Sequence, residues 1–333
     1  MLNQKTILLT GGTGSFGQKF VELVCQNYQP TRLIVFSRDE LKQYELQQRF
    51  SKRDYPFMRY FIGDVRDKDR LYRAFKGVDI VIHAAALKQV DTCEYNPFEA
   101  VKTNIIGSSN VIEAAIDSDV SHVINLSTDK AANPINLYGA TKLCADKMFV
   151  AANTYSGGSQ TRFSVVRYGN VVASRGSVVP FFLKQKEAAG VIPITDERMT
   201  RFWITLEDAV KFVLNSLQDM QGGEVFVPKI PSIKITDLAK AIAPECTHQV
   251  IGIRPGEKLH EIMISAEDAR YSIELDGSFI IYPTYIDYVN ERARRAEQLG
   301  GSVCAEGFVY GSDTNPQWLS AEQLRSSIQK LGY

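Results

Sequence analysis

The 333-residue chain lacks any apolar run long enough to cross a membrane, and it lacks a net charge. A spanning helix needs roughly 18 apolar residues in succession, and no window of the sequence reaches that length. The first apolar run begins at Thr6, which leaves no room for a signal peptide ahead of it. Because 38 Lys and Arg balance 38 Asp and Glu, no net field attracts nucleic acid or a membrane surface. We therefore expect a cytoplasmic protein that acts on a small molecule, with no nucleic-acid or membrane partner.

Cysteine and histidine are scarce and scattered. The five cysteines are widely separated and form no Cys-x-x-Cys pair, which argues against a disulfide framework and against a zinc site. The four histidines are equally dispersed, and each is more simply explained as a structural or surface residue than as a metal ligand. We predict reduced thiols and no metal.

The first half of the chain alternates short β-branched runs with longer amphipathic segments, which is typical of a parallel sheet covered by helices on both faces. The predicted strands are Thr6–Thr10, Arg32–Phe36, Met58–Ile62, Val78–His83, His122–Leu126 and Arg162–Arg167. The predicted helices are Phe16–Gln26, Asp39–Phe50, Asp67–Phe75, Pro97–Asp117 and Asn136–Thr154. The expected fold is α/β, with a doubly wound parallel sheet of the Rossmann type.

The motif Thr10-Gly-Gly-Thr-Gly-Ser-Phe-Gly17 follows the first predicted strand and opens the first predicted helix. Its glycines allow a tight turn, a close approach of the backbone to a pyrophosphate, and close packing of helix on strand, while the helix N-terminus supplies donors to the anion. The spacing differs by one residue from the usual dinucleotide fingerprint. We predict that this turn binds a dinucleotide through Gly11, Thr13, Gly14, Ser15, Phe16 and Gly17.

The second strand ends with Ser37, where an acidic side chain would hold a ribose 2′-hydroxyl. Arg38 could then pair with a 2′-phosphate, which favours NADP over NAD; an ordinary solvated arginine is the alternative. Asp39 is better explained as a helix N-terminal residue. Asp64 follows the third strand, where it could accept from an adenine amino group. The small residues Ala84–Ala85 follow the fourth strand and leave space beside a nicotinamide ribose.

After about Val171 the elements become shorter, and Pro and Gly become more frequent. We expect residues 1–170 to form an NADP-binding Rossmann domain and residues 171–333 to form mainly a smaller C-terminal substrate-binding lobe. The helix Leu206–Leu217 and the strand Glu224–Val227 are expected to return to the first domain, so that residues 205–228 belong with it.

Tyr138 and Lys142 lie in the predicted helix after the fifth strand. A spacing of four residues puts the phenol and the ammonium on one helix face, an arrangement that can make a tyrosine basic. Tyr72 and Lys76 have the same spacing, but their helix follows the third strand and is remote from a cofactor at the carboxyl edge. We therefore assign Tyr72 to a helix surface. The polar string Ser127-Thr-Asp-Lys130 precedes the other pair, and we place the chemistry there.

Long strings extend this pattern over most of the chain to about residue 265: Phe36-Ser-Arg-Asp-Glu-Leu-Lys42, Ile62-Gly-Asp-Val-Arg-Asp67, Ser127-Thr-Asp-Lys-Ala-Ala-Asn-Pro-Ile-Asn-Leu-Tyr-Gly-Ala-Thr-Lys142, Val166-Arg-Tyr-Gly-Asn-Val171, Met199-Thr-Arg-Phe-Trp-Ile204 and Gly252-Ile-Arg-Pro-Gly-Glu-Lys258. In them the chain resembles the extended short-chain dehydrogenase/reductase superfamily, and more particularly the inverting UDP-N-acetylglucosamine 4,6-dehydratases that begin pseudaminic acid synthesis in bacteria. It departs from that family at Lys88-Gln-Val-Asp91 and at Ala173, and both departures could affect substrate fit. Dehydratases that retain configuration carry Asp-Glu where Asp129-Lys130 lies here.

The resemblance implies a reaction on UDP-N-acetylglucosamine with NADP held tightly through the turnover. In that reaction Tyr138, with its pKa lowered by Lys142 and by the oxidised nicotinamide, takes the proton of the sugar 4-hydroxyl, which Thr128 also holds. Asp129 is then the acid for the C6 hydroxyl and Lys130 the base at C5. The resemblance adds Lys42, Val65, Lys88, Tyr138 and Lys142 to the cofactor ligands. It suggests Tyr168, Asn170, Arg201, Arg254 and Glu257 as substrate ligands, with Lys88 and Asn104 as weaker candidates.

One physical objection concerns the pair Asp129-Lys130. Adjacent opposite charges lower the pKa of an aspartate and raise that of a lysine, away from the acid and base roles, and only desolvation in a closed site would reverse this. Two other functions stay open. A 4-epimerase of the same superfamily would not need such a pair, and a non-catalytic dinucleotide-binding redox sensor would not need Tyr138 and Lys142 either.

The oligomeric state follows only from the resemblance. The superfamily commonly pairs through helices equivalent to Pro97–Asp117 and Asn136–Thr154, and larger rings occur in this subfamily. We expect a homo-oligomer built from dimers, with a hexamer as the larger alternative.

Overall fold

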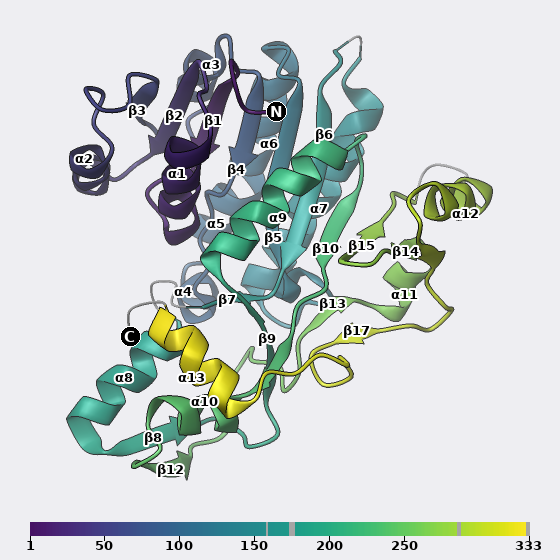
Figure 1. Ribbon diagram of the computed structural model, residues 1–333. Coiled ribbons are helices and arrows are strands. Elements are labelled where there is room, and N and C mark those ends of the chain that lie inside the picture. The colour runs from purple at the N-terminus through teal and green to yellow at the C-terminus, as the bar shows by residue number, and fades with distance from the viewer. Residues whose placement is uncertain (158, 173–176, 285–287, 331–333) are drawn as a thin grey trace.

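The computed structural model describes residues 1–157, 159–172, 177–284 and 288–330. Ala173, one of the departures from the dehydratase family, lies outside this range. Figure 1 shows a large body built around a sheet and a smaller lobe beneath it. Each part has an apolar core of its own: Phe20 and Phe163 belong to the core of the body, and Trp203 and Leu238 belong to that of the lobe.

Ten strands form the central sheet, in the order β16-β14-β15-β10-β6-β5-β4-β1-β2-β3. The segment β3-β2-β1-β4-β5-β6 is parallel and has the strand order of a doubly wound dinucleotide-binding fold. The predicted fold class is therefore confirmed. Beyond β6, the strand β10 adds in parallel and β15, β14 and β16 add antiparallel. The bounds are β1 Thr6–Thr10, β2 Arg32–Ser37, β3 Met58–Ile62, β4 Ile80–His83, β5 His122–Thr128, β6 Arg162–Tyr168, β10 Val225–Pro228, β14 Ser272–Glu274, β15 Ser278–Ile281 and β16 Ser302–Val303.

Helices cover both faces of this sheet. On one face α9 packs beside α1, and on the other α6 packs between α3 and α7 (Figure 1). Strands such as β1 are buried along their whole length because both faces are covered. The bounds are α1 Ser15–Asn27, α2 Glu40–Arg49, α3 Lys68–Phe75, α4 Val90–Tyr95, α5 Pro97–Val101, α6 Gly107–Asp117, α7 Leu137–Tyr155 and α9 Leu206–Asp219.

The prediction of one regular helix over Pro97–Asp117 is wrong in detail. The backbone widens into a π-helical turn, η1, at Lys102–Ile106, between α5 and α6. Asn104 lies in this turn, where its side chain exchanges hydrogen bonds with the backbone N–H and C=O of Leu87 at 2.8 and 2.9 Å. A wide turn of this kind is often found at functional sites. Here it attaches the loop after β4 to the helix layer.

Of the short strands and helices that follow β6 in the chain, those around α8, α10 and α13 form the lobe, whereas β13, β17, α11 and α12 contribute to the core of the body. β7 pairs with β9 and β9 with β11, while β8 pairs with β12 and β13 with β17. β13 also packs against the short 3-10 turn η2, Asp129–Ala131, which ends β5. The bounds are β7 Asn170–Val171, β8 Val191–Ile194, β9 Thr200–Ile204, β11 Ser232–Lys234, β12 Thr247–Val250, β13 Ile262–Ile264, β17 Tyr310–Gly311, α8 Val178–Ala189, α10 Ile235–Ile242, α11 Ala266–Ala269, α12 Tyr288–Gln298 and α13 Ala321–Lys330.

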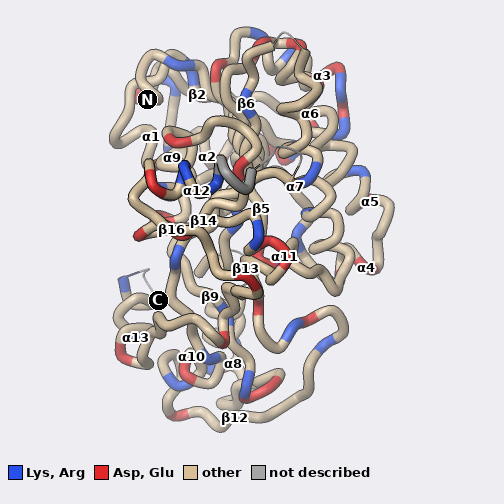
Figure 2. Tube along the Cα trace, turned by 90° about the vertical axis from the view of Figure 1, so that its right-hand side faces the viewer, with Lys and Arg blue, Asp and Glu red and all other residues tan. Residues whose placement is uncertain are grey.

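Charges of both signs are interspersed along the chain, as Figure 2 shows. Within the described residues, no helix is both long and apolar enough to span a membrane. The same residues contain no group of three or more His, Cys, Asp or Glu side chains that could hold a metal ion.

Candidate active site

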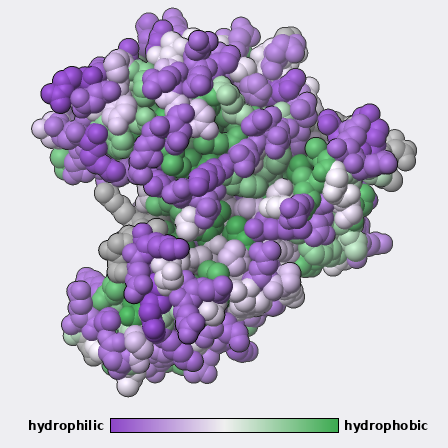
Figure 3. Space-filling model, in the orientation of Figure 1, coloured by the Kyte–Doolittle hydropathy of each residue, from purple (hydrophilic) through white to green (hydrophobic). Residues whose placement is uncertain are grey.

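The carboxyl ends of the parallel strands bring the predicted residues to one edge of the sheet. Thr10 of β1 is in register with His83 of β4, and Thr128 of β5 is in register with Tyr168 of β6. In a doubly wound sheet, ligands bind outside this edge, at the crevice where the strand order reverses. On the face shown in Figure 3, a hollow separates the body from the lobe, with hydrophobic residues inside it.

The glycine turn at this edge is closely packed. Gly11 has φ +65°, and a β-carbon there would lie 2.8 Å from the backbone of Ala84 at the end of β4. A β-carbon on Gly17 would overlap the backbone of Gly12, which explains how the start of α1 comes so close to β1. Helix α1 begins after Gly14 with no side-chain cap and no acidic residue in its first turn. This helix start therefore has the shape and polarity that an anion such as a pyrophosphate requires.

The residues that follow β2 and β3 lie close together. Arg38 approaches Asp64 at 3.6 Å, and Arg66 also pairs with Asp64 at 2.7 Å, so the Asp64 carboxylate already has two cationic partners. The Ser37 side chain is buried and accepts a hydrogen bond from Gln43 at 3.0 Å. The guanidinium of Arg38 is about half exposed, at 51% of the side chain, and so remains open to a ligand.

Asp39 and Lys42 serve the helix that follows β2. Asp39 caps α2 by accepting from the backbone N–H of Lys42, as its position in the sequence suggests. The amine of Lys42 also pairs with the Asp39 carboxylate, at 2.5 Å. Lys42 would have to exchange this partner to act as a cofactor ligand.

The turn after β5 holds a dense group of charges, the Asp129-Lys130 pair and its partners. The Lys130 amine lies 3.0 Å from Asp129 Oδ1, 3.2 Å from Glu261 Oε1 and 3.1 Å from Asn170 Oδ1. An ammonium has three donors, and these three acceptors can use all of them. Thr128 also donates to Asp129 Oδ1, at 3.0 Å. Both carboxylates are buried, and each leaves its other oxygen without a hydrogen-bond partner among the described residues.

The sequence raised the question whether desolvation reverses the pKa shifts that Asp129 and Lys130 cause in each other. The outcome differs between the two residues. Burial raises the pKa of the Asp129 carboxyl, and the nearby Glu261 charge adds to this, so that together they outweigh the Lys130 ammonium. For the aspartate, desolvation therefore has a larger effect on the pKa than the adjacent ammonium. Burial also acts to lower the pKa of Lys130, but the charges of Asp129 and Glu261 outweigh it, and the pKa is raised. Lys130 is accordingly an ammonium in this structure.

The expected effect of Lys142 on Tyr138 is not found. Burial raises the pKa of the Tyr138 phenol to about 12, and the groups that oppose the rise are Lys130 and Thr128. The Lys142 amine is buried and instead lies 3.5 Å from Asn125 Oδ1. Burial lowers the pKa of Lys142, against the attraction of Asp146. The cation that acts on Tyr138 is thus Lys130, in the turn after β5, and not Lys142 of the same helix.

Tyr72, the other tyrosine with this spacing, lies elsewhere. Its hydroxyl donates to Asp117 of α6 at 2.5 Å, on the helix layer. That contact raises its pKa to about 12. Tyr72 is thus bound into the packing of α3 on α6.

The predicted substrate ligands are only partly brought together. Asn170 contacts Lys130, as described above. Arg201 is buried, lies 3.8 Å from Glu261 and donates to the backbone C=O groups of Thr200 and Leu259. Arg254 is more exposed and pairs with Glu257 at 3.6 Å.

Two further candidates also lie near Lys130 or Tyr138. Tyr168 ends β6, and both burial and the neighbouring Tyr138 raise its pKa. Partial desolvation and the Lys130 charge lower the pKa of Lys88. Lys88 therefore lies close enough to Lys130 to be affected by its charge, and Tyr168 lies close to Tyr138.

Sequence reasoning missed several residues of this site. Glu261 lies just past the end of the Gly252–Lys258 string, and no local pattern marks it. Asn125 is a polar residue inside an otherwise apolar strand, and Asp146 follows Lys142 by one helical turn. Both positions could therefore have been recognised from the sequence. Asn125 and Ser127 donate to the Asp146 carboxylate at 3.1 and 2.6 Å. Asp146 in turn lies 3.6 Å from the buried Arg167.

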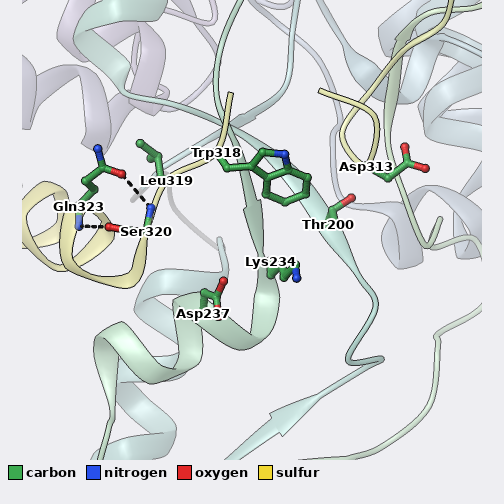
Figure 4. Close-up of a pocket in the computed structure, with 8 residues that line it drawn as sticks. All are labelled: Thr200, Lys234, Asp237, Asp313, Trp318, Leu319, Ser320 and Gln323. Carbon is green, nitrogen blue, oxygen red and sulfur yellow. Dashed lines mark hydrogen bonds between the residues drawn. The ribbon is translucent and has the colours of Figure 1, made fainter. Parts of the chain in front are cut away.

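A separate groove of about 720 Å³ lies in the lobe. Figure 4 shows Trp318 and Thr200 on one side of it and Lys234 with Asp237 on another. Ser320 and Gln323 are bonded to each other at its end. None of the predicted site residues lines this groove, although Thr200 adjoins Arg201. It is therefore distinct from the group of charges around Lys130.

The strand order, the glycine turn and the helix carrying Tyr138 and Lys142 define a Rossmann protein of the extended short-chain dehydrogenase/reductase type. Residues 7–283 match the family described as Polysaccharide biosynthesis protein, and the chain belongs to it. The UDP-N-acetylglucosamine 4,6-dehydratase (inverting) of Campylobacter jejuni is 57% identical over 331 residues, which cover 98% of each chain.

Two further relatives extend the comparison. A UDP-glucose 4-epimerase of Rickettsia canadensis is 39% identical over 322 residues, which cover 89% of this chain and 93% of that one. The X-ray structure of Pen from Bacillus thuringiensis is 38% identical, with a TM-score of 0.89 over 100% of this chain and 99% of that one.

Proposed function

We propose that this protein catalyses the NADP-dependent dehydration of UDP-N-acetylglucosamine at C4 and C6 with inversion at C5. The product is UDP-2-acetamido-2,6-dideoxy-β-L-arabino-hexos-4-ulose, and the reaction is the first step of pseudaminic acid synthesis. The observation that carries the proposal is the pair of buried Asp129 and half-buried Lys130 beside Tyr138 at the carboxyl edge of the sheet. The inverting dehydratase of Campylobacter jejuni, similar along nearly the whole chain, supports it.

The glycine turn and the start of α1 suit the pyrophosphate of the cofactor, and Arg38 suits a 2′-phosphate. When bound there, a nicotinamide dinucleotide supplies a hydride acceptor and a positive charge beside the sugar, and makes the reaction redox-neutral overall. Burial holds the pKa of the Tyr138 phenol high, so Tyr138 depends on nearby positive charge to act as a base. Its task is to take the proton of the 4-hydroxyl, which Thr128 holds.

The pair after β5 carries out the elimination. Loss of the C6 hydroxyl needs a proton donor, and loss of the C5 proton needs an acceptor. In our proposal Asp129 is the donor and Lys130 the acceptor. The structure holds Lys130 as an ammonium 3.0 Å from Asp129 Oδ1. Transfer of one proton across this contact makes the neutral acid and the neutral amine together, without any change of net charge.

The remaining ligands position the nucleotide. Arg254 and Arg201 carry guanidinium groups that match phosphate oxygens, and Asn170, Glu257, Tyr168 and Lys88 complete the proposed substrate site. Lys258 donates to the backbone C=O of Ala132 at 2.6 Å, and Asn136 donates to that of Gly256 at 2.8 Å. These two bonds attach the segment bearing Arg254 to the loop after Lys130, so the nucleotide site and the reacting groups are held together.

Mass spectrometry of the purified protein with UDP-N-acetylglucosamine and no added cofactor tests the proposal. Loss of one water from the sugar nucleotide is the expected result. Proton NMR of a reaction run in heavy water should then show deuterium at C5 of an inverted product. A product of unchanged mass and altered configuration would indicate a 4-epimerase, the function named for the Rickettsia relative. No change at all would indicate a dinucleotide-binding sensor.

We also propose that the protein assembles from dimers. Tyr95 of α4 and Phe98 of α5 are exposed by 87% and 77% beside the helices expected to pair. Exposed large apolar groups of this kind commonly mark an interface. Light scattering should give a mass of at least two chains of 37.3 kDa. A monomeric mass would contradict this proposal.

A further inference from the structure

Glu261 is the buried residue whose contacts the proposed reaction does not yet use. It directly precedes β13, far along the chain from Lys130, and its side chain reaches the turn after β5, where Oε1 lies 3.2 Å from the Lys130 amine. The side chain is only 3% exposed. Its second oxygen has no hydrogen-bond partner among the described residues. Burying a carboxylate costs free energy unless its charge is paired and its oxygens are hydrogen-bonded.

The surroundings of Glu261 contain more positive than negative groups. Lys130 is shared with Asp129, and Arg201 of β9 lies 3.8 Å from Glu261. The charged or titratable groups that act on Glu261 or on the pair are Asp129 and Lys130 of η2, Arg201 of β9, Tyr138 of α7, Lys88 after β4 and Lys258 before β13. Burial and the neighbouring cations both favour loss of a proton from Lys130. The Glu261 carboxylate opposes that loss.

We propose that Glu261 is a positioning residue of the Asp129-Lys130 pair: its carboxylate holds the Lys130 amine beside Asp129 and keeps one proton shared between these two side chains. The inference rests on the proposed dehydratase function, because elimination needs one group of the pair protonated and the other free. It holds whichever of the two gives the proton and whichever takes it. Without the Glu261 charge, both groups would release their protons at lower pH.

Two geometric observations and one electrostatic observation support this assignment. The three acceptors around the Lys130 amine, on Asp129, Glu261 and Asn170, can together use all three of its donors. Glu261 is itself fixed, because its backbone N–H donates to Ser312 at 2.9 Å and its C=O accepts from the backbone N–H of Ser312 at 2.8 Å. Finally, the pKa of Glu261 is lowered, since Lys130, Arg201 and Lys258 outweigh the effect of burial, so its charge is permanent at neutral pH.

The test compares the pH dependence of water loss in wild-type protein with that in Glu261→Gln, which keeps an oxygen acceptor and removes the charge. Removing a negative charge lowers the pKa of both groups of the pair, so the whole range of pH in which the enzyme works should move to lower pH, by about one unit or more. Glu261→Asp, whose carboxylate is withdrawn from Lys130, should shift the range less and in the same direction. KM should change little, because the proposal gives Glu261 no substrate contact.

The matched control is Glu224→Gln. Glu224 is equally buried, but its carboxylate accepts from Ser164 and from backbone N–H groups and faces no lysine or arginine in the described contacts. This variant should keep the wild-type pH range. Thermal unfolding of each variant identifies those that fail to fold, and if Glu261→Gln fails, Glu261→Asp alone must show the shift. An unshifted range in a folded Glu261 variant would overturn the inference. An absence of water loss in wild-type protein would instead overturn the proposed function.

Discussion

Gly139 in the first turn of α7 packs directly against Lys130: a β-carbon at position 139 would overlap the Lys130 carbonyl oxygen. The helix that bears Tyr138 therefore rests on the turn that bears the acid/base pair. Asn136 caps this helix by accepting from the Gly139 backbone N–H at 2.8 Å. The relative position of Tyr138 and Lys130 thus depends on the absence of a side chain at residue 139.

Gly139→Ala should displace the turn after β5. Because the overlapping atom belongs to the backbone, the turn or the helix has to move, and a misplacement of this size can cost about 10²-fold in rate. Steady-state measurement of water loss should show this fall in kcat. Gly277→Ala is the control, since a β-carbon there meets no atom within 4 Å. Equal rates for the two variants would contradict the argument.

Lys130→Met should abolish the exchange of the C5 proton. Methionine fills a similar space but cannot take or give a proton, and a lost acid/base group costs about 10²- to 10⁴-fold. NMR of deuterium incorporation at C5 in heavy water measures the effect. Lys76→Met, the lysine of the Tyr72 pair, should exchange at the wild-type rate. Exchange that persists in Lys130→Met would show that another group is the base.

Arg38→Ala should weaken the binding of NADP more than that of NAD. The variant loses a charge-assisted contact to the 2′-phosphate, worth about 1.5–3 kcal/mol, or roughly ten- to a hundredfold in Kd. Titration of the cofactor-stripped protein with each dinucleotide measures the ratio of the two constants. Arg53→Ala removes an exposed arginine that pairs only with Asp54 in the described contacts and should leave the ratio unchanged. A constant ratio in Arg38→Ala would indicate that Arg38 is an ordinary surface residue.

Asp146→Ala should destabilise the fold. Among the described contacts, the substitution leaves Arg167 with its Asp268 contact at 3.2 Å and its bond to the Met263 C=O. Removing one partner of a buried ion pair costs about 3–5 kcal/mol. Urea unfolding at neutral pH measures the change in the free energy of unfolding. Asp54→Ala, which breaks an exposed pair, should have little effect. A midpoint for Asp146→Ala equal to that of wild type would show that the network adds nothing to stability.

His83→Gln should flatten the acid side of the stability curve. Burial and the Lys142 charge lower the pKa of His83 from 6.5 to about 3 in the folded protein, whereas the unfolded chain keeps its ordinary pKa. Between these values the unfolded state binds the extra proton, so stability falls as the pH is lowered from 6.5 and the loss is complete near 3. It amounts to on the order of 5 kcal/mol.

Urea unfolding across this pH range measures the slope for His83→Gln and for its control. His248→Gln, on the exposed strand β12, should keep the wild-type slope. A slope in His83→Gln equal to that of wild type would mean that His83 is not held neutral by the fold.

The sequence by itself determined the features that depend on neighbouring residues. Hydrophobic alternation located the six parallel strands, and the glycine spacing located the turn before α1, because both signals lie within one element. The same holds for Asp129-Lys130 and for Tyr138, which one continuous string carries. The regular helix expected over Pro97–Asp117 was wrong at the π-helical turn because Asn104 bonds to Leu87 on a distant loop.

Only the tertiary structure decided what these residues can do. Glu261 lies far along the chain, just before β13, and no local pattern reveals that it shares Lys130 with Asp129. The sequence could not show the protonation of the pair either. Burial raises the pKa of Asp129, and the carboxylates of Asp129 and Glu261 raise that of Lys130. That Lys130 and Thr128 are the groups that lower the pKa of Tyr138 in this structure was hidden for the same reason. A pKa depends on burial and on every charge nearby, and both are set by the packing of segments that the sequence keeps apart.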